Sequence, residues 1–427
     1  MVNKLWPPQD QLFWSLNLES EPPCHGIIEA EVVVIGGGFA GLSAAHAFAQ
    51  KGKKVILLEQ YYCGSGASGK SSGFITADAE LSLSDFANRY NLAAAQAIWN
   101  FFEHGVQYIE ATIKKYQLEC DYKKQDTLVV ANRKKDLKEL KENHNNLEKA
   151  GYKSFYYSKE QLKNYLETSH YYGALRYEDT FSINSYLYCQ QMKKVLIEHG
   201  VKVFEQSPAL HIDNHTITTP HAKITADYII VCADRFIPML GLLTQEVSQV
   251  QTFLMLSEQV SQDTIKSLYP ENTYMVWDME LIYSYFRIAH GNRILLGGST
   301  LWATYASQEY HNYMPIIKKL VNYFHTVFPQ VKVQFEHIWP GLIGVSKDIG
   351  PIAGPDKKYP HIYYIGAAAG LPIAAALGNY SAQYYLESRR DLDEYFSPYR
   401  SFAINNTVQR VLGKTVSFAL SHLISTS

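Results

Sequence analysis

The chain has 427 residues, which is enough to bury large hydrophobic cores and is typical of a two-domain protein. Its formal net charge of −2 lacks the basic excess of nucleic-acid-binding proteins, so no nucleic acid is expected as a partner. The five cysteines are scattered without a CxxC pair, which argues against a zinc ribbon or a disulfide framework and favours a reducing compartment.

Signals for targeting and for metal binding are weak. Pro7 and Pro8 lie in an N-terminal region that lacks the apolar core of a signal peptide. The fifteen histidines include no HExxH motif, and His211 and His215 fall in a strand and turn context. We therefore expect a cytoplasmic protein without a metal site.

Residues 31–59 predict a strand, a glycine turn, a helix and a second strand. In the turn, Gly36, Gly38 and Gly41 occupy the three glycine positions of GxGxxG. The first glycine permits the tight turn, the second lets backbone approach a pyrophosphate, and the third lets the helix over 42–50 pack closely. The N-terminus of that helix then faces the phosphates with its positive dipole end.

Glu59 ends the second apolar strand, ~20 residues beyond the glycine turn, where an acid binds the 2′-hydroxyl of a ribose. An acid at this position disfavours a 2′-phosphate, so the expected ligand is NAD or FAD rather than NADP. A glycine-rich structural turn without a ligand is the alternative interpretation.

A second glycine-rich stretch, residues 64–73, follows directly. Its small residues let the backbone approach a large flat ligand, and Ser68, Ser71 and Ser72 add hydroxyl donors. Lys70 adds a cation that would stabilise negative charge on a reduced flavin. A flexible loop is the other interpretation of this composition.

The middle of the chain alternates helical and strand patterns. Apolar residues recur on one face of a predicted long helix over 91–118. Further helices are predicted over 133–149 and 184–199, and strands over 201–204, over 224–232 and at intervals through 250–345.

The run 362–378 carries no charge and approaches the lower length limit of a membrane span. Gly366, Gly370 and a proline interrupt it, however. We therefore expect a strand over 362–365, a glycine turn and a helix over 374–385. A transmembrane helix is the alternative.

These motifs resemble the FAD-dependent oxidoreductases of the D-amino-acid oxidase type, and among them the amine-oxidising branch that includes gamma-glutamylputrescine oxidase. That branch has a segment similar to GASGRNGG, where residues 66–73 read GASGKSSG, so Lys70 replaces arginine and Ser71 and Ser72 replace Asn-Gly. Further similar segments are residues 13–30, 226–234, 285–298 and 339–354.

The resemblance implies an α/β fold with a discontinuous Rossmann-like FAD domain and an interleaved substrate domain with an antiparallel sheet. The expected FAD domain comprises 27–80, 180–235 and 341–390, the substrate domain 81–175 and 236–340, and a C-terminal helical tail 391–427.

The resemblance also implies bound FAD. No cysteine stands in 339–346 and no histidine in 68–73, the familiar attachment sites, so the FAD is expected to be non-covalent. The expected cofactor-binding residues are Gly36, Gly38, Phe39, Ala40, Gly41, Glu59, Gln60, Ser68, Gly69, Lys70, Ser71, Ser72, Gly73, Ala209, Cys232, Ala233, Gly341, Gly366, Gly370 and Leu371.

The chemistry implied is oxidation of an amine C–N bond by hydride transfer to flavin N5, giving an imine that water hydrolyses. The candidates to line the substrate pocket are Tyr283, Tyr285, Arg287 and Trp339, although the tyrosines and the tryptophan are equally explained by packing. Ile343 stands where related amino-acid oxidases have a carboxylate-binding arginine, which favours an amine, although Arg287 is a candidate replacement clamp.

Three questions stay open at this point. A D-amino-acid or glycine oxidase or dehydrogenase is the alternative enzyme, and a catalytically silent flavin-binding protein is the alternative from another class. The electron acceptor is oxygen or a quinone. The tail over 408–424 is expected to dock on its own domain as a helix, with a membrane-surface helix as the alternative.

Overall fold

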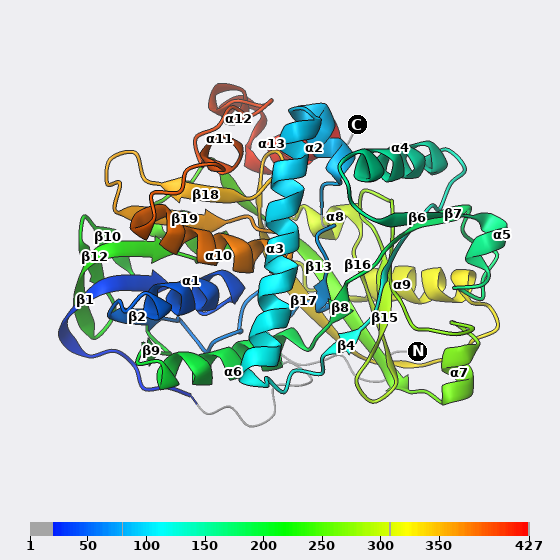
Figure 1. The fold of residues 1–427 in the computed structure, drawn as a ribbon, viewed down its shortest axis with the longest axis horizontal. Coiled ribbons are helices and arrows are strands. Elements are labelled where there is room, and N and C mark those ends of the chain that lie inside the picture. The colour runs from blue at the N-terminus through cyan, green and yellow to red at the C-terminus, as the bar shows by residue number, and fades with distance from the viewer. Residues whose placement is uncertain (1–19, 79, 307–308, 426–427) are drawn as a thin grey trace.

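The computed structural model describes residues 20–78, 80–306 and 309–425. Two eight-stranded sheets lie side by side, and helix α3 (Leu92–Tyr116) crosses in front of the boundary between them (Figure 1). The first part of the similar segment 13–30, residues 13–19, falls outside the described residues.

The first sheet is mainly parallel and is centred on β1. Its parallel strands run in the order β9, β2, β1, β12 and β19, with β18 antiparallel beside β19 and the hairpin β10–β11 beside β12. The bounds are β1 (Gly26–Ile35), β2 (Val55–Leu58), β9 (Lys202–Phe204), β10 (His211–Asp213), β11 (Thr216–Thr218), β12 (Ala222–Val231), β18 (Ile352–Pro355) and β19 (Ile362–Gly366).

Both faces of this sheet are covered, which explains the continuous apolar run in β1. Val32 and Val34 pack into the core beneath α1 (Phe39–Gln50) and α10 (Leu371–Leu386). The intervening Val33 joins the core on the opposite face. Successive strand side chains point to opposite faces, so a strand buried on both sides must be apolar at every position.

The second sheet is mainly antiparallel, in the order β17, β13, β16, β15, β14, β5, β7 and β6, with only the β14–β5 pair parallel among its described strands. The bounds are β5 (Thr127–Val130), β6 (Ser154–Ser158), β7 (Gly173–Tyr177), β13 (Val247–Gln259), β14 (Met275–Asp278), β15 (Tyr285–Ala289), β16 (Arg293–Gly298) and β17 (Phe335–Ser346).

A small sheet connects the two large ones. It contains β3 (Phe74–Ile75), β8 (Phe181–Ser182) and β4 (Lys123–Lys124). The remaining helices are α2 (Leu83–Arg89), α4 (Asp136–Lys149), α5 (Lys159–Leu162), α6 (Ser185–Glu198), η1 (Asp234–Leu240), α7 (Gln262–Lys266), α8 (Leu301–Thr304), α9 (Met314–Val327), α11 (Asp393–Phe396), α12 (Asn406–Leu412) and α13 (Lys414–Ser425).

Three predicted helices have different bounds in the structure. Helix α1 begins at Phe39, earlier than the predicted 42–50, because extended Gly38 already serves as its N-cap. Helix α10 begins at Leu371, since the proline in its first turn suits a helix start. The tail is two helices rather than one, because Gly413 adopts a φ of +80° and ends α12.

The membrane-span alternative for residues 362–378 is wrong. The first part of this run is β19, which pairs with β12 inside the first sheet, and the rest begins α10. Within the described residues, no helix combines the length and the apolar character needed to cross a bilayer.

The helices α3 and α10 touch at a glycine. A Cβ at Gly105 in α3 would clash with the backbone carbonyl of Pro372 in α10. We expect Gly105→Ala to lower the free energy of unfolding by about 1–3 kcal/mol, because the helices must separate to admit the methyl group. Thermal unfolding measures the change.

Gln107→Ala, on an exposed position of the same helix, is the matched control and is expected to change the free energy of unfolding by less than about 0.5 kcal/mol. An unfolding curve of Gly105→Ala that overlays the wild type would contradict the close contact.

The C-terminal tail docks on the body of the protein. Phe418 in α13 is buried, and the buried ring of His422 lies within hydrogen-bond distance of the Tyr305 hydroxyl and the Ser346 carbonyl oxygen, 2.8 Å in each case. The outward face still carries apolar side chains, including Val411, which is 84% exposed. The docked helix that the sequence predicted is therefore present in the structure.

Truncation after Asn405 is expected to lower solubility and thermal stability, because it uncovers the surface beneath α13. Differential scanning calorimetry of full-length and truncated protein measures the effect. Unchanged thermal stability together with loss of binding to lipid vesicles would instead assign the tail to a membrane surface.

Candidate active site

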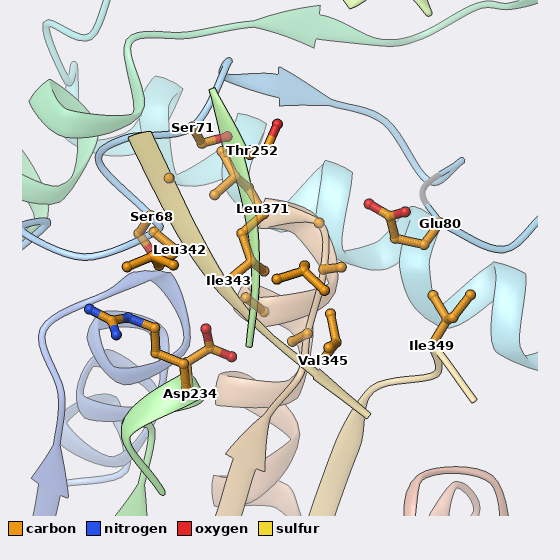
Figure 2. Close-up of a pocket in the computed structure, with 18 of the residues that line it drawn as sticks. Ser68, Ser71, Glu80, Asp234, Thr252, Leu342, Ile343, Val345, Ile349 and Leu371 are labelled. Carbon is orange, nitrogen blue, oxygen red and sulfur yellow. The ribbon is translucent and has the colours of Figure 1, made fainter. Parts of the chain in front are cut away.

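A cavity of about 1090 Å³ runs from the carboxyl ends of the first sheet to the wall of the second sheet. This exceeds the usual size of a site for one small ligand. Figure 2 shows Ser68 and Asp234 on one side of the cavity and Glu80 on the other, with Ile343 and Leu371 between them in this view. In parallel sheets, ligands bind at this edge, where loops leave the strands.

The three glycines of the turn are each required by a different close approach. Gly36 has a φ of +111°, and a Cβ there would lie 2.5 Å from the carbonyl oxygen of Cys232, at the end of β12. A Cβ at Gly38 would lie 2.8 Å from the Ser68 hydroxyl oxygen. A Cβ at Gly41 would overlap the carbonyl oxygen of Gly36. The turn is therefore closed by contacts that only glycine permits.

The N-terminus of α1 opens toward the cavity. Its first turn contains no acidic residue, and its N-cap, Gly38, offers no side chain to the backbone N–H groups. The N–H of Phe39 donates to the hydroxyl oxygen of Ser68 at 3.0 Å, which fixes the second glycine-rich stretch beside the helix end. Such a helix end favours an anionic group.

Glu59 lies at the end of β2 with its carboxylate held by the loops. It accepts hydrogen bonds from the N–H groups of Gly37 at 2.7 Å and Tyr61 at 2.9 Å. Burial raises the pKa of the Glu59 carboxyl, and these backbone hydrogen bonds oppose the rise. The side chain lines the cavity, where its predicted contact with a ribose stays a prediction.

Beside Glu59 is a buried ion pair that sequence reasoning missed. Lys193 in α6 lies 3.2 Å from the carboxylate of Glu205, directly after β9. Glu205 also accepts hydrogen bonds from the N–H groups of Cys63 at 2.7 Å and Glu21 at 2.8 Å. Three separate segments therefore bind one carboxylate. The only signal for this ion pair in the sequence is an acidic residue at the end of a predicted strand.

Asp234 is a half-buried carboxylate that sequence reasoning did not single out. It follows β12 and accepts hydrogen bonds from the N–H groups of Gly344 in β17 at 2.7 Å and of Ala367, directly after β19, at 3.0 Å. A Cβ at Gly344 would overlap the Asp234 carboxylate. Burial raises the pKa of the Asp234 carboxyl, and the two amide donors oppose the rise.

The second sheet supplies the opposite wall of the cavity. Tyr283 and Tyr285 both line it, as predicted, and the Tyr283 hydroxyl donates to the Glu80 carboxylate at 2.7 Å. The Tyr285 hydroxyl lies 3.4 Å from the hydroxyl of Thr252, a neighbour that the sequence did not indicate. Burial raises the pKa of the Tyr285 phenol to about 12, so it stays neutral at physiological pH.

The structure places the other two predicted pocket residues outside the lining. The Arg287 guanidinium donates to the carbonyl oxygens of Ser72 at 2.7 Å and Ile183 at 2.9 Å, and burial lowers its pKa to about 10. The indole N–H of Trp339 donates to the carbonyl oxygen of Lys70 at 3.2 Å. Both side chains therefore hold the second glycine-rich stretch rather than facing the cavity.

Most predicted cofactor residues do line the cavity. Gly41, Gly69 and Gly73 do not, because they pack against backbone. Those that do are Gly36, Gly38, Phe39, Ala40, Glu59, Gln60, Ser68, Lys70, Ser71, Ser72, Ala209, Cys232, Ala233, Gly341, Gly366, Gly370 and Leu371.

Comparison with known proteins agrees with this geometry. The family described as DAO: FAD dependent oxidoreductase matches residues 31–384, which is most of the chain. The chain belongs to the DAO family of FAD-dependent oxidoreductases. The predicted cofactor, FAD, and the predicted α/β fold with a Rossmann-like domain are thereby confirmed.

Two curated proteins illustrate this DAO-family relationship. The probable oxidoreductase OrdL of Haemophilus influenzae is 30% identical over 367 residues, covering 83% of this chain and 81% of that protein. Gamma-glutamylputrescine oxidoreductase of Escherichia coli is 27% identical over 350 residues, covering 80% of each.

Two solved structures share the fold. L-Proline dehydrogenase from P. horikoshii matches with a TM-score of 0.75 and 17% identity, covering 87% of this chain and 97% of that chain. Glycine oxidase from Geobacillus kaustophilus matches with a TM-score of 0.74 and 15% identity, covering 88% of this chain and 100% of that chain.

The cavity residues fit FAD. The glycine turn leaves room for a pyrophosphate beside α1, and a side chain at Gly38 would fill that room. The N-cap of α10, Gly370, likewise has no side chain to bind the first N–H groups of its helix, so these groups would be available to an electronegative atom of the cofactor. Ser68, Ser71 and Ser72 supply hydroxyls between these two helix ends.

Purified wild-type protein is expected to be yellow, with one FAD per chain that mild denaturation releases. Gly38→Val should abolish loading, because its side chain would occupy the pyrophosphate position and press on Ser68. The ratio of flavin to protein absorbance measures this. Gln50→Val, at the exposed end of the same helix, is the control and should load normally. A colourless wild-type protein that binds NAD would contradict the assignment.

Proposed function

We propose that this DAO-family oxidoreductase oxidises a C–N bond of a small amine. The observation that carries the proposal is which residue lines the cavity at position 343. It is Ile343, at the position where related amino-acid oxidases have a carboxylate-binding arginine. The other candidate clamp, Arg287, donates instead to backbone carbonyl oxygens. The relationship to gamma-glutamylputrescine oxidoreductase supports the same donor class.

The cavity residues have simple tasks in such a reaction. The chemistry that non-covalent FAD supplies when bound is acceptance of a hydride from the carbon beside the amine nitrogen, leaving an imine that water hydrolyses. Tyr283 and Tyr285 orient the substrate with their rings and with hydroxyls that stay neutral. Ile343 and Leu371 exclude water from the reacting end with apolar surface.

A D-amino-acid or glycine oxidase is the second candidate function. Glycine oxidase of Bacillus subtilis is 22% identical over 358 residues, covering 80% of this chain and 87% of that protein. This candidate requires a cation that binds the α-carboxylate, and Lys70 on the second glycine-rich stretch is a candidate because it lines the cavity.

Anaerobic mixing of the holoenzyme with a panel of primary amines, secondary amines, D-amino acids and glycine tests the proposal. Bleaching of the flavin absorbance is expected with amines, at rates at least about tenfold above those with amino acids, because the latter bury an unpaired carboxylate. Faster reduction by glycine or D-amino acids would favour the second candidate. No reduction by any compound would indicate a flavin-binding protein without turnover. Reoxidation by oxygen or by a soluble quinone then identifies the acceptor.

A further inference from the structure

Tyr283 and Tyr285 form one wall of the cavity, here called the tyrosine wall. The cavity extends beyond this wall into a part that is lined mainly by carboxylates. We define this acidic lobe by the residues that line it between β3, α2, α4 and β14. Within the described chain its basic members are Arg133 and Lys135. Its acidic members are Asp78, Glu80, Asp85, Asp136, Glu139, Asp278 and Glu280.

The basic side chains of the acidic lobe are already shared among carboxylates. Arg133 lies 3.1 Å from Asp136 and 3.4 Å from Glu280. Among the described residues, no basic side chain forms an ion pair with Asp78 or Glu80. Acidic side chains therefore outnumber basic ones in the lining of this lobe.

Glu80 links the acidic lobe to the tyrosines that line the cavity, and Asp78 lies near Glu80. Glu80 accepts the hydroxyl hydrogen of Tyr283, which is part of the wall opposite the glycine turn. Burial raises the pKa of Asp78, and the neighbouring charges of Asp85 and Glu80 raise it further. The carboxylates thus repel one another, and a cation placed between them would remove that repulsion.

A second, independent observation in the same part of the cavity points to a ligand. Thr76 lines the cavity and is only 5% exposed, yet its hydroxyl has no hydrogen-bond partner among the described residues. Buried hydroxyl groups are normally satisfied, and a polar ligand in the cavity would supply the missing partner. Thr76 precedes Asp78 and Glu80 on the segment between β3 and α2.

Apolar side chains also line the cavity beside carboxylates of the acidic lobe in the sequence. Trp277, Met279 and Leu281 alternate with Asp278 and Glu280, and they offer surface to a chain of methylene groups. An alkyl chain in this position would carry its far end from the tyrosine wall into the acidic lobe.

We propose that the acidic lobe binds a second, cationic group of the substrate, so that the enzyme selects diamines or polyamines over monoamines and α-amino acids. The inference rests on the proposed amine oxidation and specifies its substrate class. One ammonium group, after losing its proton to solvent water, is the reacting amine beside the tyrosines, and the other donates to Glu80 and Asp78. A substrate carboxylate in the lobe would be repelled instead.

The test compares 1,4-diaminobutane with 1-aminopentane, which has the same length but a methyl group in place of the second ammonium. Their dissociation constants from the oxidised holoenzyme are measured anaerobically by calorimetry, and the rates of flavin reduction are measured separately. Wild type is expected to bind the diamine at least about tenfold more tightly, since hydrogen bonds to charged groups are worth that much.

Glu80→Gln and Asp78→Asn are each expected to remove most of this preference while leaving the dissociation constant of 1-aminopentane within about twofold. Glu80→Asp, which keeps the charge, should retain part of the preference. Glu271→Gln is the control, because Glu271 is exposed and lies outside the cavity lining.

Equal binding of the two amines by wild type would overturn the inference, and so would a preference that survives in both charge-neutral variants. If the diamine binds selectively but no amine reduces the flavin, the proposed oxidation fails while the acidic lobe stands as a cation site. If both amines bind equally and both reduce the flavin, the oxidation stands and the inference fails.

Discussion

The arrangement of the site depends on one half-buried carboxylate, that of Asp234. Asp234 joins the end of β12 to β17 and to the segment after β19. Burying a charge is costly, and here two backbone N–H groups offset the cost. Because β17 pairs along most of its length with β13, the carboxylate fixes the substrate wall relative to the glycine turn.

The second glycine-rich stretch is held in a comparable way, but from the side of the second sheet. Arg287 in β15 and Trp339 in β17 both donate to carbonyl oxygens of this stretch, at Ser72 and Lys70. At the other end of the stretch, the Ser68 hydroxyl accepts a hydrogen bond from the N–H of Phe39 at the N-terminus of α1. A segment rich in glycine and serine has little structure of its own, so its shape comes from these external donors.

Local patterns predicted much of the fold, because the glycine turn, the strand β1 and the long helix α3 depend on neighbouring residues alone. The roles of Asp234 and Glu80 depend on contacts between segments far apart in sequence, which no local pattern records. Arg287 shows the same limit. The alternation of strand side chains predicts that Arg287 lies on the same face of β15 as Tyr285, but it does not predict whether the cavity reaches that far along the strand.

The anchoring of the glycine-rich stretch by Arg287 and Trp339 has a thermodynamic consequence. A cofactor that binds only when this stretch is ordered also favours the conformation of the strands that order it. Cofactor occupancy and the integrity of the second sheet are therefore linked quantities, although most of the expected cofactor contacts come from the first sheet. Loss of the cofactor would therefore destabilise the strands that form the substrate wall as well as the glycine-rich stretch.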